Sequence, residues 1–196
     1  MLYKEILSSA AISLTFIAFF PYIRSILQGK TKPHVFSWVI WGSTTFIVFL
    51  AQLSDGGGAG SWPIGVSGVI TLYVAILAYT KKSDSTITKV DWGFLFLAMM
   101  SLPLWYFTSD PLWAVVILTT VDLIGFGPTF RKAYHQPFEE RLLFYNLMAA
   151  RNLIAVAALE HYSPTTVLFP AVLGVTTVIF VFMVMLRRQK NHIDDF

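Results

Sequence analysis

The chain has 196 residues, of which 56% are hydrophobic and only 13% are charged. A soluble domain usually carries about a quarter charged residues, so this composition excludes an ordinary soluble protein. Cysteine is absent, which excludes disulfides, thiolate metal sites and cysteine nucleophiles. The charges stand in short clusters between apolar stretches of roughly 17–22 residues, a length that crosses about 30 Å of hydrocarbon as a helix.

The apolar stretches predict seven transmembrane helices, because a backbone with unpaired polar groups cannot face lipid. In chain order they cover Glu5–Leu27, Val35–Leu53, Trp62–Thr80, Val90–Phe107, Leu112–Phe130, Leu142–Leu159 and Thr166–Leu186. The first stretch differs from a secretory signal, since its apolar run is too long and Pro21-Tyr22-Ile23-Arg24 replaces a small-residue cleavage site. We therefore expect an all-α integral membrane protein that retains its first helix.

Basic residues gather on one side of the predicted helices. The loops after the first, third and fifth helices and the C-terminal tail carry Arg24, Lys30, Lys32, Lys81, Lys82, Lys89, Arg131, Lys132, Arg141, Arg187, Arg188 and Lys190. The opposite side has only Lys4, Glu5, Asp55, Asp110 and Glu160. The positive-inside rule then predicts a cytoplasmic C-terminus and an N-terminus outside, in the inner or plasma membrane of the cell. The net charge of +3 therefore reflects topology, and no nucleic-acid partner is expected.

Two parts of the chain match at an offset of 107 residues. FFPYIR at Phe19–Arg24 aligns with FGPTFR at Phe126–Arg131, so that phenylalanine, proline and arginine coincide. Overall identity is low, which leaves chance as the alternative to duplication. A three-helix unit begins and ends on opposite sides of the membrane, so a second copy in the same orientation needs an extra crossing. We therefore expect a first repeat over residues 1–82, a linker helix within 83–110 and a second repeat over 111–196.

This arrangement resembles the SWEET and PQ-loop group of seven-helix membrane transporters. That group has a proline near the cytoplasmic end of the first helix of each repeat, followed by a short basic loop, and Pro21 and Pro128 fit the pattern. The glutamine that normally follows the proline is replaced by Tyr22 and Thr129. The resemblance implies 3+1+3 parallel repeats with an inversion linker, alternating access about a midplane site, and hinges at Pro21 and Pro128.

Two ionisable residues, Asp122 and Arg151, stand inside apolar stretches. They lie about eight and nine residues from the cytoplasmic face, which corresponds to about 12 and 14 Å of helix. An isolated charge at such depth is costly, so each group needs a partner or water. We expect them to face each other across the bundle, either as a structural salt bridge or within a solute site. A carboxyl at this depth also raises the hypothesis of proton-coupled transport, which uptake under an imposed pH gradient would test.

The offset maps Thr44 onto Arg151 and Thr45 onto Asn152. In SWEET-like transporters this part of the second helix of each repeat borders the central pocket, so the resemblance implies a solute site there. Trp41 is a further candidate because an aromatic ring stacks on planar ligands, although tryptophans near helix ends also serve as interfacial anchors. The candidate substrate-binding residues are Trp41, Thr44, Thr45, Asp122, Arg151 and Asn152.

The third predicted helix contains the small residues Gly65, Ser67 and Gly68. Small residues let neighbouring membrane helices approach closely, and the sequence favours this role over contact with a ligand. The SWEET group usually carries an asparagine in the third helix of each repeat, and this chain has none there. That difference favours a polar or charged solute over an ordinary sugar.

We expect a transporter or facilitator of a small polar solute, sugar-like, amino-acid-like or otherwise charged, whose partners are that solute and the lipid bilayer. The alternative is a non-transporting receptor or trafficking protein on the same fold. Neither a catalytic residue nor a cofactor is predicted. A metal site is not expected either, because His34, His135, His161 and His192 are placed at helix ends or tails on both sides. The sequence leaves open whether the chain forms a homo-oligomer.

Overall fold

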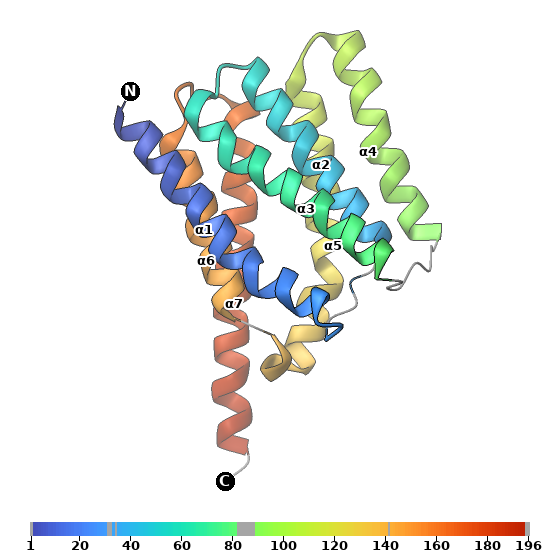
Figure 1. Cartoon of the computed structure of the whole chain (residues 1–196), viewed down its shortest axis with the longest axis vertical. Helices are drawn as coiled ribbons and strands as arrows, with labels where there is room; N and C mark the ends of the chain where they lie inside the picture. The colour runs from blue at the N-terminus through green and yellow to red at the C-terminus, as the bar shows by residue number, and fades with distance from the viewer. Residues whose placement is uncertain (1, 31–32, 34, 82–88, 141, 195–196) are drawn as a thin grey trace.

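The structure is a computed structural model that describes residues 2–30, 33, 35–81, 89–140 and 142–194 (Figure 1). Within these residues the α-helices are α1 (Leu2–Leu27), α2 (Val35–Ser54), α3 (Trp62–Thr80), α4 (Lys89–Thr108), α5 (Pro111–His135), α6 (Leu142–Ala158) and α7 (Pro164–Asp194). Two short 3-10 helices, η1 (Gly58–Ser61) and η2 (Pro137–Glu139), precede α3 and α6. The predicted helices are therefore all present, and α5 and α7 continue several residues past their predicted ends.

Some predicted features lie outside the described part of the chain. These are the residues Lys32, His34, Lys82 and Arg141, and the side chains of Pro128, Arg131, Lys132 and His192. The backbone of α5 is nevertheless helical past residue 128, and α1 is helical past Pro21. Neither helix ends at its predicted hinge, and the hinges themselves stay a prediction.

The outer surface of the bundle is apolar. Four segments are long and apolar enough to cross a membrane, namely Leu2–Leu27, Val35–Ser54, Gly58–Thr80 and Pro164–Lys190, and α4, α5 and α6 contribute shorter apolar segments. Large apolar side chains remain exposed along these helices, among them Phe16, Phe20, Ile76, Ile179 and Phe182. Soluble proteins rarely expose extended apolar patches, so these helices identify an integral membrane protein.

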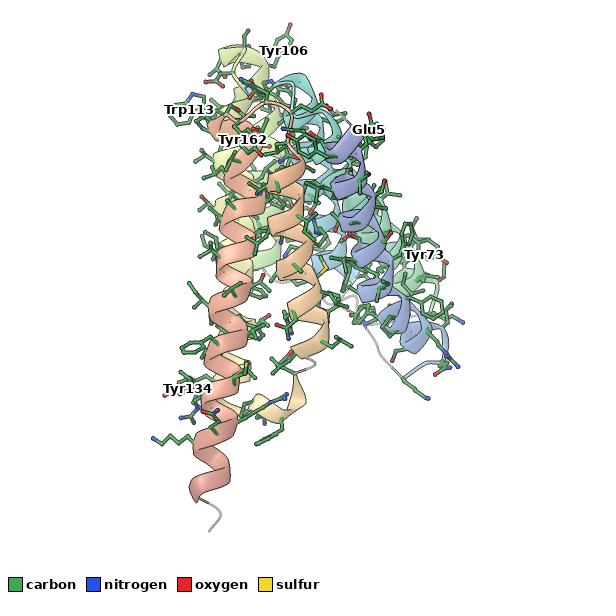
Figure 2. The ribbon with its side chains drawn as sticks, turned by 90° about the vertical axis from the view of Figure 1, so that its left-hand side faces the viewer. Glu5, Tyr73, Tyr106, Trp113, Tyr134 and Tyr162 are labelled. Atoms are coloured by element: carbon green, nitrogen blue, oxygen red, sulfur yellow. The ribbon has the colours of Figure 1, made fainter. Side chains whose placement is uncertain are left out.

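Successive helices run in opposite directions (Figure 1). The N-terminus lies at one end of the bundle, and the C-terminal part of α7 extends beyond the opposite end. Exposed aromatic residues are found toward both ends. Tyr106, Trp113 and Tyr162 lie near the N-terminal end, and Tyr134 lies toward the other (Figure 2). Such rings favour the headgroup level of a bilayer, which agrees with helices that cross the membrane from end to end.

The helices pack in two sets. In the first set α3 packs against both α1 and α2, and in the second α7 packs against both α5 and α6. The sets meet mainly where α1 contacts α6 and where α2 contacts α5, with smaller contacts of α3 with α6 and of α2 with α7. α4 lies at the edge of the bundle, against α5 and α2 (Figure 1). The boundary between the sets is therefore lined by α1, α2, α5 and α6.

Glycines allow α2 and α3 to pack closely. A Cβ atom added at Gly65 would lie 2.8 Å from the ring of Phe49, and one added at Gly68 would lie 3.0 Å from the backbone nitrogen of Phe46. Both distances are shorter than ordinary van der Waals contact. The predicted packing role of these two glycines is confirmed.

Candidate functional site

The carboxylate of Asp122 on α5 faces α2. Thr44 Oγ1 lies 3.0 Å from Asp122 Oδ1 and 3.0 Å from the backbone oxygen of Trp41. Thr44 is fully buried, and its hydroxyl has a single proton to donate. Either oxygen can accept this proton, and donation to Asp122 links α2 to α5. This contact crosses the boundary between the two sets of helices.

Trp41 lies beside the same contact. A Cβ atom added at Gly125 would be 3.3 Å from Trp41 Nε1, so the indole packs against α5. Gly125 follows Asp122 by about one helical turn, and Thr44 follows Trp41 by the same interval. Two successive turns of α2 therefore face two successive turns of α5. This contact brings together three of the predicted site residues, Trp41, Thr44 and Asp122.

Arg151 on α6 points across the boundary at α3. It is only 3% exposed, and its Nη2 donates to Ser67 Oγ at 3.0 Å. Its Nε and Nη1 atoms have no hydrogen-bond partner among the described residues. Each unpaired donor in a low-dielectric interior carries a desolvation cost, which is larger for a charged group. Arg151 is therefore a buried cation whose hydrogen-bonding capacity is mostly unused within the described chain.

The predicted pairing of Asp122 with Arg151 is wrong. Asp122 is bound by Thr44, and the one hydrogen bond of the Arg151 side chain within the described residues goes to Ser67. The physical reason is the order of helices around the bundle. α5 and α6 follow each other in the chain, but each packs extensively against α7. Equal depth in the membrane therefore did not place the two side chains face to face.

Thr45 and Asn152 are also buried, at 8% and 3% exposure. Asn152 packs toward α7, since a Cβ atom added at Gly174 would lie 3.3 Å from Asn152 Cβ. Its Oδ1 has no hydrogen-bond partner among the described residues. One residue advances a helix by about 100°, so Asn152 points away from the α3 side that Arg151 faces. Trp41, Thr44 and Asp122 thus lie at the α2–α5 contact, Arg151 and Asn152 lie on the buried side of α6, and Thr45 is buried on α2.

An aromatic cluster lies between this polar layer and the end of the bundle opposite the N-terminus. Tyr22 stacks on Trp38 with ring centroids 5.1 Å apart, and Trp38 meets Trp41 edge-on at 5.9 Å. Phe19 on α1 contacts Phe144 on α6 at 5.8 Å and so connects the two sets. Trp38 is therefore part of an internal aromatic cluster, a role distinct from that of a lipid-facing anchor.

Hydrogen bonds join the two sets at the end that carries the N-terminus. We call this group the latch, and it comprises Gln52, Asp55, Gly57, Glu160, His161, Ser163 and Thr166. Gln52 Nε2 donates to Thr166 O at 2.6 Å, and Glu160 N donates to Gly57 O at 3.1 Å. The hydroxyl of Ser163 donates to the carboxylate of Asp55. These bonds hold the α2–α3 connection against the α6–α7 connection.

Sequence reasoning missed Ser67 as the partner of Arg151 and missed the latch. Ser67 stands in a run of small residues, and the only signal for it was its hydroxyl. Gln52 and Asp55 lie at the C-terminal end of α2. Polar residues are common at the ends of helices, so these two gave no signal of a contact with another part of the chain. Among the described residues, no group of three or more His, Asp or Glu side chains is placed to hold a metal ion.

Comparison of the chain with protein-family models, with curated proteins and with solved structures gives no match. The function is therefore inferred from two features of the fold. One is the pair of polar contacts that cross between the sets, Thr44 with Asp122 and Arg151 with Ser67. The other is the latch that closes one end of the boundary on which these contacts lie.

Proposed function

We propose that the protein is a secondary transporter or facilitator of a small polar solute, built from two parallel three-helix units with α4 as the linker. In each unit the third helix packs against both of the others. The contacts between units also correspond, because α1 with α6 matches α5 with α2, and α3 with α6 matches α7 with α2. This is the relation expected of two parallel repeats about an axis along the membrane normal.

Matched side chains support the duplication. At the offset of 107 residues Phe19 corresponds to Phe126 and Trp38 to Tyr145. In the first unit the ring centroids of Phe19 and Trp38 are 6.3 Å apart. In the second unit the ring centroids of Phe126 and Tyr145 are 6.2 Å apart. The ring separations match while the interplanar angles are 75° and 53°, and the shared separation at matched positions favours duplication over chance.

The observation that carries the proposal is the position of the two polar contacts. Thr44 and Arg151 correspond in the two units, and each bonds a residue of the other unit. Polar and ionisable groups inside a membrane bundle are costly, and they characteristically mark solute pathways. Alternating access moves one unit against the other about such a midplane site. The two contacts therefore lie where a solute would bind between moving parts.

The latch and the aromatic cluster are the proposed gates. The latch holds the units together at the N-terminal end, which the basic loops predict to be outside. The aromatic cluster would gate the cytoplasmic end, and Pro21 and Pro128 would absorb the bending. In this proposal the latch must open in every transport cycle.

A disulfide across the latch tests this mechanism. A Cβ atom added at Gly56 would lie 3.6 Å from His161 Cβ, within the separation of about 3.5–4.5 Å that a disulfide requires. Gly56 has a φ of +74°, which strains any other residue, so the single Gly56→Cys variant also controls for that strain. The chain has no cysteine of its own, so the double variant Gly56→Cys/His161→Cys contains the only thiols. We expect oxidation to stop solute counterflow in liposomes and reduction to restore it.

The controls are the two single-cysteine variants, whose rate of counterflow should not change when the oxidant is added. The solute panel should contain sugars, amino acids, nucleosides and carboxylates. Counterflow that continues in the fully cross-linked protein would refute alternating access at the latch. Absence of counterflow for every solute would favour the alternative of a receptor on this fold.

A further inference from the structure

We propose that Arg151 and Ser67 form the binding subsite for the carboxylate group of the solute. The inference rests on the proposed transport function and adds the chemical class of the cargo. It starts from a side chain that is 3% exposed and positively charged, with two of its three nitrogen atoms lacking any partner among the described residues.

The first step concerns charge. Among the acids whose side chains are described, Glu5, Asp55, Asp110, Glu140 and Glu160 belong to helix ends and connections. Asp122 is the described acid within a membrane-crossing helix, and its Oδ1 is bound by Thr44 across the α2–α5 contact. A buried cation is tolerated when a partner neutralises it. A solute with a single negative charge supplies that partner.

The second step concerns geometry. A guanidinium presents its N–H donors in a planar fork that matches the two oxygens of a carboxylate. The Nε–H and both N–H bonds of Nη1 have no acceptor among the described residues, and Nη2 gives one of its two N–H bonds to Ser67. The second N–H of Nη2 can pair with an N–H of Nε or of Nη1, so one two-donor edge of the guanidinium stays available. Ser67 Oγ accepts the bond from Nη2, so its own proton remains available as a further donor. Ser67 therefore orients the fork and adds one donor beside it.

The third step separates carboxylates from other solutes. An uncharged sugar would leave the positive charge of Arg151 without compensation. A dianionic phosphate would bring two negative charges to a single guanidinium. A monocarboxylate balances one cation with one anion and satisfies the fork, so it fits the subsite best.

Thermal unfolding of the purified full chain in detergent provides the test. The probes are lactate and acetate, each compared with its uncharged amide, together with glucose and inorganic phosphate. Binding to the folded state raises Tm by mass action. We expect at least one carboxylate to raise the Tm of the wild-type protein, and its amide to leave the Tm unchanged.

Variants identify the side chain responsible. Arg151→Met should weaken carboxylate binding about 10- to 100-fold, the loss expected for hydrogen bonds from a charged donor. Ser67→Ala should weaken it less, because the charge remains and only its orientation is lost. Arg24→Met removes an exposed cation from the last turn of α1 and should keep the wild-type response.

Three results would overturn the subsite. They are an unchanged carboxylate response in Arg151→Met, an equal response to the amides, and no response of the wild-type protein to either carboxylate. If Arg151→Met fails to fold, Ser67→Ala and Arg151→Lys decide, since full affinity in both contradicts the geometry. Carboxylate binding without counterflow would support the carboxylate subsite and refute the proposed transport function. Counterflow of an uncharged solute alone would support the transport function and refute the carboxylate subsite.

Discussion

Substitution of methionine for Arg151 removes a positive charge from the membrane interior while the length of the side chain is nearly kept. The guanidinium has one hydrogen bond, to Ser67 at 3.0 Å, and its Nε and Nη1 are unpaired in the described structure. Placing an arginine at the centre of a membrane helix costs about 2.5–3.5 kcal/mol on insertion scales. The bond to Ser67 returns about 1.5–3 kcal/mol, the usual contribution of a charged hydrogen bond.

The difference between these terms predicts that Arg151→Met changes the free energy of unfolding by between about −0.5 and +2 kcal/mol, where a positive value means stabilisation. A structural ion pair predicts a large loss of stability instead, because removing one partner of a buried pair costs about 3–5 kcal/mol. The assay is equilibrium unfolding in mixed micelles without added solute, with Arg151→Lys as the charge-conserving control. A loss of stability of about 3 kcal/mol or more would refute the assignment of Arg151 as an uncompensated charge.

Three further predictions concern other parts of the bundle. Thr44→Val should destabilise the protein by about 1–3 kcal/mol, because the carboxylate on α5 loses its donor, whereas Thr44→Ser should be nearly neutral in the same unfolding assay. Gly65→Val should cost about 1–3 kcal/mol or more by forcing α2 from α3. The control is Gly93→Ala, because a Cβ atom at Gly93 meets nothing within 4 Å, and this change should be neutral or stabilising by up to about 1 kcal/mol. Equal thermal shifts for Gly65→Val and Gly93→Ala would contradict the close packing of α2 against α3. Asp55→Asn should weaken the latch and speed the reaction of an introduced Thr45→Cys thiol with a membrane-impermeant maleimide, and an unchanged rate would exclude the latch as a gate.

The helices were predictable from the sequence because the thickness of a bilayer sets the length of an apolar run. The predicted Trp62–Thr80 coincides with α3, and the predicted Val35–Leu53 is one residue shorter than α2. The exceptions are α5 and α7, which end at His135 and Asp194. A helix can continue into water with polar residues, and hydropathy detects only the part that suits hydrocarbon.

The site was predictable only in part. Asp122 and Arg151 stood out because a charge in an apolar stretch demands a partner, and the internal repeat related Thr44 to Arg151. Their partners were not predictable. The spacing of residues along the sequence gives the depth of a side chain in the membrane, but it does not tell which helix lies beside it at that depth. Ser67 was hidden for this reason within a run of small residues.

The sequence by itself determined that the chain is helical and membrane-embedded, since both follow from local composition and from the need to pair the backbone in lipid. The tertiary structure alone decided which helices are neighbours. It placed α7 against both α5 and α6 and paired Asp122 with Thr44. It also paired Arg151 with Ser67 and left two nitrogen atoms of Arg151 without a partner among the described residues. These outcomes depend on how apolar faces pack around the bundle, and packing is a property of all the helices together.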